Sequence, residues 1–133
     1  MDVLAHFRNA RSVVTLPRGT VIFAEGEQGD KMYVLIQGRA DISVGGEVIE
    51  SAHPGALLGE MALVISAPRS ATITAVTECK VVPVEPRQFD LLVRESPEFA
   101  RYVMKVMAER LRRMNERMKE ALRELSVRGG RPK

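Results

Sequence analysis

Several residue types are scarce in this chain of 133 residues, and each scarcity removes a class of function. The chain has no tryptophan, one cysteine and two histidines, and aromatic residues make up only 5% of it. His6 and His53 are far apart and carry no ligand motif, so a metal site of several converging imidazoles is not expected. No Ser-His-Asp or Cys-His arrangement is present either. We therefore predict a binding protein that has no enzymatic activity, no cofactor and no metal.

The single cysteine and the shortness of the apolar runs limit where the protein works. Cys79 alone cannot form an intramolecular disulfide, which favours a reducing compartment. No apolar run approaches the roughly 20 residues of a membrane span. Polar residues such as Asp2 and Arg8 interrupt any signal-peptide core. We expect a cytoplasmic protein without a membrane span, in which Cys79 is a small strand residue.

The positive charge is concentrated at the C-terminal end. The formal net charge is +3, from 20 basic and 17 acidic side chains. Residues 1–100 carry 9 basic and 13 acidic side chains, whereas residues 101–133 carry 11 basic and 4 acidic ones. A general nucleic-acid-binding surface is therefore not indicated. We predict no sequence-specific nucleic-acid binding from this chain alone.

Residues 12–85 have the pattern of a β-roll. Apolar and polar residues alternate in short β-branched segments that glycines separate, and Gly45-Gly46 is predicted to form a hairpin turn. We predict strands at Val13–Leu16, Val21–Ala24, Lys31–Gln37, Arg39–Val44, Glu47–Ser51, Ser70–Val76 and Lys80–Val84. Short strands at this spacing are typical of an antiparallel β jelly-roll barrel.

After residue 85 the hydrophobic period becomes helical. Pro86 suits the first turn of a helix that runs to about Arg94. Ser96 is the predicted N-cap, with Pro97 at the first helical position, of a long helix that ends near Leu125. We predict one domain over residues 1–133: a short helical segment at 1–11, the β-roll at 12–85, the C-terminal helices at 86–126 and a flexible basic tail at 127–133.

One face of the predicted long helix repeats apolar residues at alternating spacings of three and four. These residues are Met104, Met107, Leu111, Met114, Met118, Ala121 and Leu125. This heptad pattern is that of a coiled-coil seam. A helix of ~28 residues is ~42 Å long, which overhangs a β-roll of this size. We predict a homodimer through this helix; packing against its own β-roll alone is the alternative.

The segment Gly59–Thr72 combines the chemical groups of a ribose-phosphate site. Gly59 lets backbone N–H groups approach a ligand closely, and converging N–H groups can hold an anion. Arg69 supplies a planar fork of donors that matches phosphate oxygens. Glu60 only accepts hydrogen bonds when ionised, which suits a sugar hydroxyl. An ion pair between Glu60 and Arg69 that merely fixes a loop is the alternative.

This segment resembles the phosphate-binding cassette of the cyclic nucleotide-binding domain family. The family pattern is Gly-Glu-x-Ala-Leu, a short spacer, and Pro-Arg-Ser/Ala/Thr-Ala-Thr. It is matched here by Gly59, Glu60, Ala62, Leu63, Pro68, Arg69, Ser70, Ala71 and Thr72. Leu58 stands where the family often has phenylalanine, and we interpret it as a packing variant. The preceding segment Gly26–Gly38 and the helices between Pro86 and Leu125 also resemble the family.

The resemblance implies a sensor of a cyclic purine nucleotide, cyclic AMP or cyclic GMP, whose C-terminal helices change position when the ligand binds. It implies that Arg69 and Ser70 contact the cyclic phosphate and that Glu60 accepts from the ribose 2′-hydroxyl. The remaining ligand-binding positions are the backbones of Gly59 and Met61 at the sugar, Ala62 N–H at the phosphate, and Ile42 and Ile49 under the base. Family members also cover the base with the last helix, near Arg110, Met114 and Asn115 here.

Two alternatives for the function stay open. The chain resembles the ligand-binding and dimerisation part of a catabolite-activator-type transcription regulator, but only about eight residues follow Leu125, too few for a helix-turn-helix domain. The other alternative is a degenerate domain that binds no nucleotide and serves only for dimerisation. The intact cassette argues against it.

Overall fold

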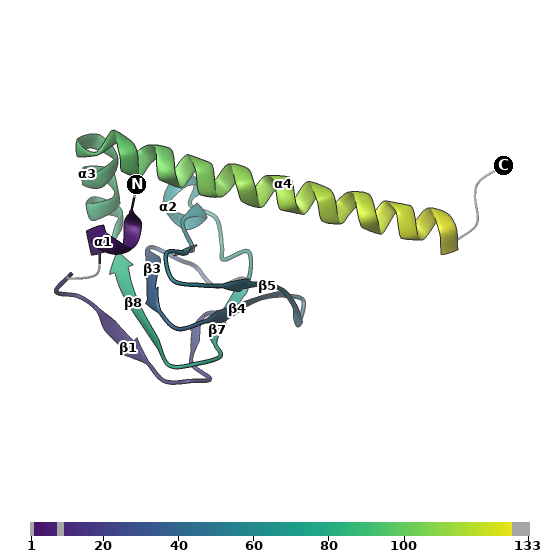
Figure 1. Ribbon diagram of the computed structural model, residues 1–133, viewed down its shortest axis with the longest axis horizontal. Helices are drawn as coiled ribbons and strands as arrows, with labels where there is room; N and C mark the ends of the chain where they lie inside the picture. The colour runs from purple at the N-terminus through teal and green to yellow at the C-terminus, as the bar shows by residue number, and fades with distance from the viewer. Residues whose placement is uncertain (1, 8–9, 129–133) are drawn as a thin grey trace. The chain divides into compact units, whose positions relative to one another are not determined.

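The computed structural model describes residues 2–7 and 10–128. It divides into two compact units, Met1–Ala100 and Arg101–Lys133, which are described separately. The first unit contains the helices α1 (Val3–Phe7), α2 (Met61–Ile65) and α3 (Pro86–Glu95), together with every strand in the described ranges (Figure 1). The strands are β1 (Val14–Leu16), β2 (Val21–Phe23), β3 (Met32–Gln37), β4 (Ala40–Val44), β5 (Glu47–Ala52), β6 (Leu57–Leu58), β7 (Thr72–Ala75) and β8 (Cys79–Val84).

The strands form two four-stranded antiparallel sheets. One has the order β1-β8-β3-β6 and the other the order β2-β7-β4-β5. The mainly β jelly-roll class with C-terminal helices is therefore confirmed, but the predicted closure into a barrel is wrong. Within the described residues, no strand of one sheet pairs with a strand of the other, so each sheet keeps its own two edges.

The core lies between the two sheets because strands of both contribute alternate side chains to it. Its buried cluster consists of Phe23, Leu35, Ala40, Ile42, Ala52, Leu58, Ile73, Ala75, Cys79 and Val81. Cys79 is fully buried at the start of β8, as expected for a small strand residue. Leu58 is 1% exposed, which confirms that it packs in the core.

The predicted strand and helix boundaries agree with the structure to within two residues in most places. Gly45 and Gly46 have φ angles of 60° and 85° and join Val44 directly to its partner Glu47, which is the predicted hairpin. The sequence interpretation missed β6 and α2. Two and five residues are too short to display a hydrophobic period.

Three aromatic rings join the short helices of the first unit. Phe99, in the first turn of α4 (Pro97–Arg128), is fully buried. Its ring centroid lies 6.2 Å from that of Phe7 in α1 and 5.9 Å from that of Phe89 in α3. The predicted N-cap is confirmed, since the Phe99 N–H donates to Ser96 Oγ at 3.2 Å.

The second unit consists of α4 from Arg101 onward. The helix reaches Arg128, so the predicted end near Leu125 and the predicted tail from residue 127 are wrong at Val127 and Arg128. No helix breaker precedes Gly129 at this end of the chain, which explains the continuation. The rest of the predicted tail, residues 129–133, lies outside the described residues. In the isolated chain the distal seam is open to solvent: Met118 is 62% exposed and Leu125 is 65% exposed.

Candidate nucleotide-phosphate site

The cassette begins with a sharp turn between β6 and α2. Gly59 has a φ of +77°, in the left-handed region that only glycine adopts without strain. The chain then forms α2, whose first turns are closed by bonds from Ala62 N–H to Gly59 O at 3.2 Å and from Leu63 N–H to Glu60 O at 3.1 Å. The helix ends at Ser66, which is also left-handed at φ 49°. These two turns direct the chain out to Arg69 and back into β7.

Main-chain hydrogen bonds attach Arg69 to the glycine turn that follows β2. The Arg69 N–H donates to Glu27 O and the Gly26 N–H donates to Arg69 O, both at 2.8 Å. Next to this pair, the Glu25 N–H donates to Thr72 Oγ1 at 2.9 Å. The cassette and the turn before β3 are thus held together although more than forty residues separate them in sequence.

The guanidinium of Arg69 occupies a narrow slot. Its Nη2 donates to Lys31 O at 2.7 Å and its Nη1 to Gly59 O at 3.3 Å. A Cβ built on Gly29 would lie 2.2 Å from Arg69 Nε, and one built on Gly59 would lie 2.3 Å from Nη1. The guanidinium therefore fits only because both neighbours are glycines. The Cζ atom of Arg69 lies 4.0 Å from the centroid of the Phe23 ring.

Arg69 is a buried cation, and its N–H donors are not all bonded to the described residues. The side chain is 7% exposed, and its Nε is buried with no hydrogen-bond acceptor among the described residues. Burial lowers the pKa of Arg69, while Tyr33, Asp30 and Glu27 nearby act in the opposite direction. The guanidinium carries more N–H groups than its two carbonyl bonds use. An anionic oxygen is the partner that such a group favours.

The structure brings most of the predicted ligand residues into one region of the first unit. Glu60 follows Gly59 and is fully buried, whereas Met61 is 37% exposed and Ser70, next to Arg69, is exposed. Arg69 bonds two main-chain carbonyls, and the alternative of a loop-fixing pair between Arg69 and Glu60 stays open.

The predicted base wall lies on the sheet that carries Phe23. Ile42 in β4 is opposite Ile73 in β7, and Ile73 is in turn opposite Phe23 in β2. Ile42 is buried in the core, while Ile49 in β5 is half-buried against it. The predicted lid residues Arg110, Met114 and Asn115 lie on α4 in the second unit, and their role stays a prediction.

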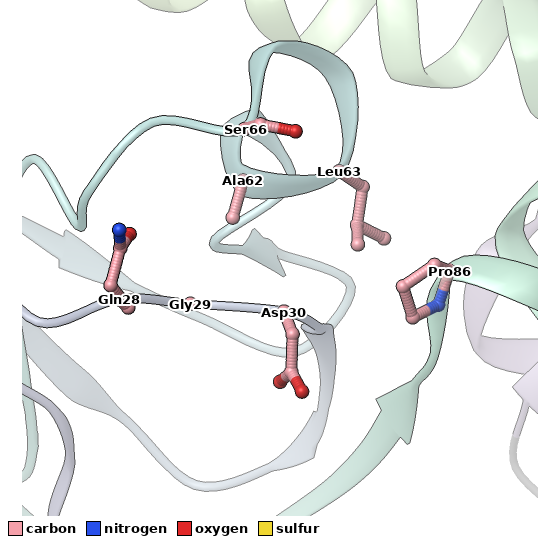
Figure 2. A pocket seen from close by; sticks show the side chains of 7 residues that line it. All are labelled: Gln28, Gly29, Asp30, Ala62, Leu63, Ser66 and Pro86. Carbon is pink, nitrogen blue, oxygen red and sulfur yellow. The ribbon is translucent and has the colours of Figure 1, made fainter.

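A pocket of about 490 Å³ adjoins the cassette on α2. Figure 2 shows Ala62 and Leu63 pointing out of α2, with Leu63 directed toward Pro86 at the start of α3. The residues that line the pocket are Gln28, Gly29, Asp30, Ala62, Leu63, Ser66 and Pro86. Of the predicted ligand residues only Ala62 borders this pocket.

Sequence reasoning missed two parts of the slot, the Phe23 ring and the Lys31 carbonyl. Phe23 lies within the predicted strand Val21–Ala24. Nothing in its position predicts a contact with Arg69, because forty-six residues separate the two. The carbonyl of Lys31 has no side-chain signature at all.

Two observations concern the predicted lack of a membrane span and of a metal site. None of the helices within residues 2–7 and 10–128 has an apolar stretch long enough to cross a lipid bilayer. In the same ranges, no group of three or more His, Cys, Asp or Glu side chains is placed to hold a metal ion. The cytoplasmic location stays a prediction.

Comparisons with known proteins agree on one family. A model of the cyclic nucleotide-binding domain matches residues 13–96. The chain is 36% identical over 108 residues to a cyclic nucleotide-gated potassium channel of Mesorhizobium japonicum, covering 81% of this chain and 30% of the channel. It is 31% identical over 114 residues to a CRP-like cAMP-activated global transcriptional regulator of Mycobacterium tuberculosis, covering 82% of this chain and 51% of the regulator.

The fold has a matching solved structure. The catabolite activator protein of Thermus thermophilus superposes with a TM-score of 0.73 at 26% identity, covering 82% of this chain and 54% of that one. The chain thus spans about half or less of the length of these relatives. The family model covers most of the β-roll and the cassette, and the chain therefore belongs to the cyclic nucleotide-binding domain family.

Proposed function

We propose that this chain is a receptor module for a cyclic purine nucleotide and has no enzymatic activity of its own. The observation that carries the proposal is the buried guanidinium of Arg69, whose Nε has no acceptor among the described residues. A buried donor without a partner costs about 1–3 kcal/mol. An oxygen of a cyclic phosphate at this position removes that cost and adds a charge-assisted bond.

The other cassette residues take roles around this contact. Ser70 is exposed beside Arg69 and adds a hydroxyl or an N–H to the phosphate, and Glu60 accepts from the ribose 2′-hydroxyl. The backbones of Gly59 and Met61 approach the sugar. The Ala62 N–H, which bonds Gly59 O here, turns to the phosphate when the ligand is bound. Ile42 and Ile49 form the apolar wall under the base, and cyclic AMP is the favoured ligand over cyclic GMP.

Ligand binding is proposed to change the position of α3 and α4. Such a change is a population shift, driven by contacts that the nucleotide makes in one state only. Arg110, Met114 and Asn115 then cover the base. The signal leaves through a homodimer formed by the α4 seam, in a single domain or in a longer regulator. Relatives that include a channel and a transcriptional regulator support a regulatory role.

The ribose contact gives a direct test of the receptor function. We expect nucleotide-free protein to bind cyclic AMP with a micromolar or lower Kd in isothermal titration, and to bind 2′-deoxy cyclic AMP about tenfold more weakly. Glu60→Gln keeps the volume of the buried side chain and removes its charge. In this variant the preference for the 2′-hydroxyl should largely disappear.

Cyclic GMP, titrated in parallel, identifies the preferred base. The sample should first be unfolded and refolded so that bound nucleotide is removed. A folded sample that gives no heat with either nucleotide would contradict the receptor function and favour a degenerate dimerisation domain. An unchanged preference for the 2′-hydroxyl in Glu60→Gln would show that the ribose contact does not depend on the charge of Glu60, since the glutamine amide oxygen can still accept.

The dimer has its own test on the exposed seam of α4. Met118→Asp places a charge in the middle of the seam, and burying an unpaired charge is costly. We expect sedimentation equilibrium to show a dimer for the natural sequence and a monomer for Met118→Asp. Arg112→Asp, which lies off the seam on the same helix, should leave the dimer intact. A monomer for the unsubstituted protein would contradict the proposed dimer through the α4 seam.

A further inference from the structure

Phe23 borders the slot that holds Arg69 but is not one of the predicted ligand-binding residues. It is the last residue of β2, and its side chain is 8% exposed. Its backbone is opposite Ile73 in β7, so the ring points into the core from the same sheet as Ile42. The ring of Tyr33 lies beside it, with centroids 6.2 Å apart. The ring of Phe23 is therefore fixed in its position on β2.

The face of the Phe23 ring closes the slot that holds the guanidinium of Arg69. The carbonyls of Lys31 and Gly59 fix the ends of the guanidinium, and the backbones of Gly29 and Gly59 limit its sides. The ring lies across the remaining face at 4.0 Å from Cζ. It also touches the cassette turn, since a Cβ on Gly59 would lie 3.0 Å from Phe23 Cε2.

The Phe23 ring contacts a guanidinium that is largely excluded from water, because Arg69 is buried. A cation over an aromatic face is attracted by the ring quadrupole, and the attraction grows when the pair is desolvated. A guanidinium stacks with its plane on a ring, which leaves its edge free for bonds in that plane. An aliphatic residue of similar volume would fill the space but would not fix the plane.

We propose that Phe23 is a positioning residue that holds the Arg69 guanidinium in the plane in which it binds the cyclic phosphate. The inference rests on the proposed function, because the role of Phe23 is expressed through nucleotide affinity. Phe23 touches Arg69 and the cassette turn. It acts on the phosphate only through the orientation of Arg69.

Graded fluorination of the ring tests this role. Fluorine withdraws electron density from the ring face and changes its shape little. We expect the cyclic AMP affinity to fall stepwise as Phe23 is replaced by mono-, di- and trifluorophenylalanine, and to fall about tenfold in Phe23→Leu. The same fluorinated residues at Phe89, which is equally buried but faces the ring of Phe99, should leave the NMR resonance of the Arg69 Nε–H in nucleotide-free protein unchanged.

A nucleotide-free measurement separates this inference from the function on which it rests. In the NMR spectrum of nucleotide-free protein, the ring current of Phe23 should shift the Arg69 Nε–H resonance, and Phe23→Leu should abolish the shift. If the unsubstituted protein binds cyclic AMP and fluorination of Phe23 does not change this affinity, the positioning role alone is overturned. Natural protein that binds neither nucleotide would overturn the proposed function and this role together.

Discussion

Arg69→Ala is expected to weaken cyclic AMP binding by at least one to two orders of magnitude. A charge-assisted bond to phosphate contributes ~1.5–3 kcal/mol, which corresponds to that range. The buried position of Arg69 increases this loss of affinity, because the buried phosphate would then face the carbonyls of Lys31 and Gly59 that Arg69 no longer bonds. Arg69→Lys should recover little, since an ammonium cannot bond both carbonyls and a phosphate in one plane. Isothermal titration of the three proteins measures the effect.

The same variants must be checked for folding, because Arg69 is also a structural cross-link. Urea unfolding of Arg69→Ala should show a loss of about 1–3 kcal/mol from the two orphaned carbonyls. Arg18→Ala is the matched control, since Arg18 is exposed in the turn between β1 and β2. It should change neither stability nor affinity. Folded Arg69→Ala protein that binds cyclic AMP normally would exclude Arg69 as the phosphate ligand.

Gly59→Ala is expected to damage both the fold and the site. The left-handed φ of +77° costs a non-glycine residue about 1–2 kcal/mol. The added Cβ would also lie 2.3 Å from Arg69 Nη1 and 3.0 Å from Phe23 Cε2, so the guanidinium must leave its slot. We expect a destabilisation of roughly 2–4 kcal/mol in urea unfolding and a loss of detectable cyclic AMP binding.

Gly45→Ala separates the two causes. Gly45 also has a positive φ, +60°, but a Cβ there meets nothing within 4 Å. This variant should show the backbone cost alone, roughly 1 kcal/mol, with unchanged affinity. Equal losses of stability in the two variants, with cyclic AMP binding retained in Gly59→Ala, would show that the slot tolerates a methyl group and that the steric argument is wrong.

The sequence predicts those parts of the fold that depend on local signals. Period-two strands, the hairpin at Gly45-Gly46 and the helix start at Ser96-Pro97 are each specified by residues within a few positions of one another. The end of α4 was misplaced because Val127 and Arg128 carry no stop signal and the glycines come only afterwards.

The candidate site was predicted as a set of residues but not as a geometry. The cassette motif identifies Glu60 and Arg69, and it places them beside a glycine turn. That Arg69 stacks on Phe23 and bonds the Lys31 carbonyl follows only from the pairing of distant strands. The open sheets likewise depend on which edges find partners, which strand patterns do not specify.

The paired main-chain bonds between Arg69 and the turn at Gly26 and Glu27 make two loops into one opening unit. Neither loop can leave the surface without breaking bonds of the other, so their amide protons should exchange with solvent in the same local fluctuation. Any ligand that tightens the cassette therefore slows exchange in the turn as well. A perturbation at residue 26 or 27 is in turn felt at residue 69 as a change in the free energy of that shared opening.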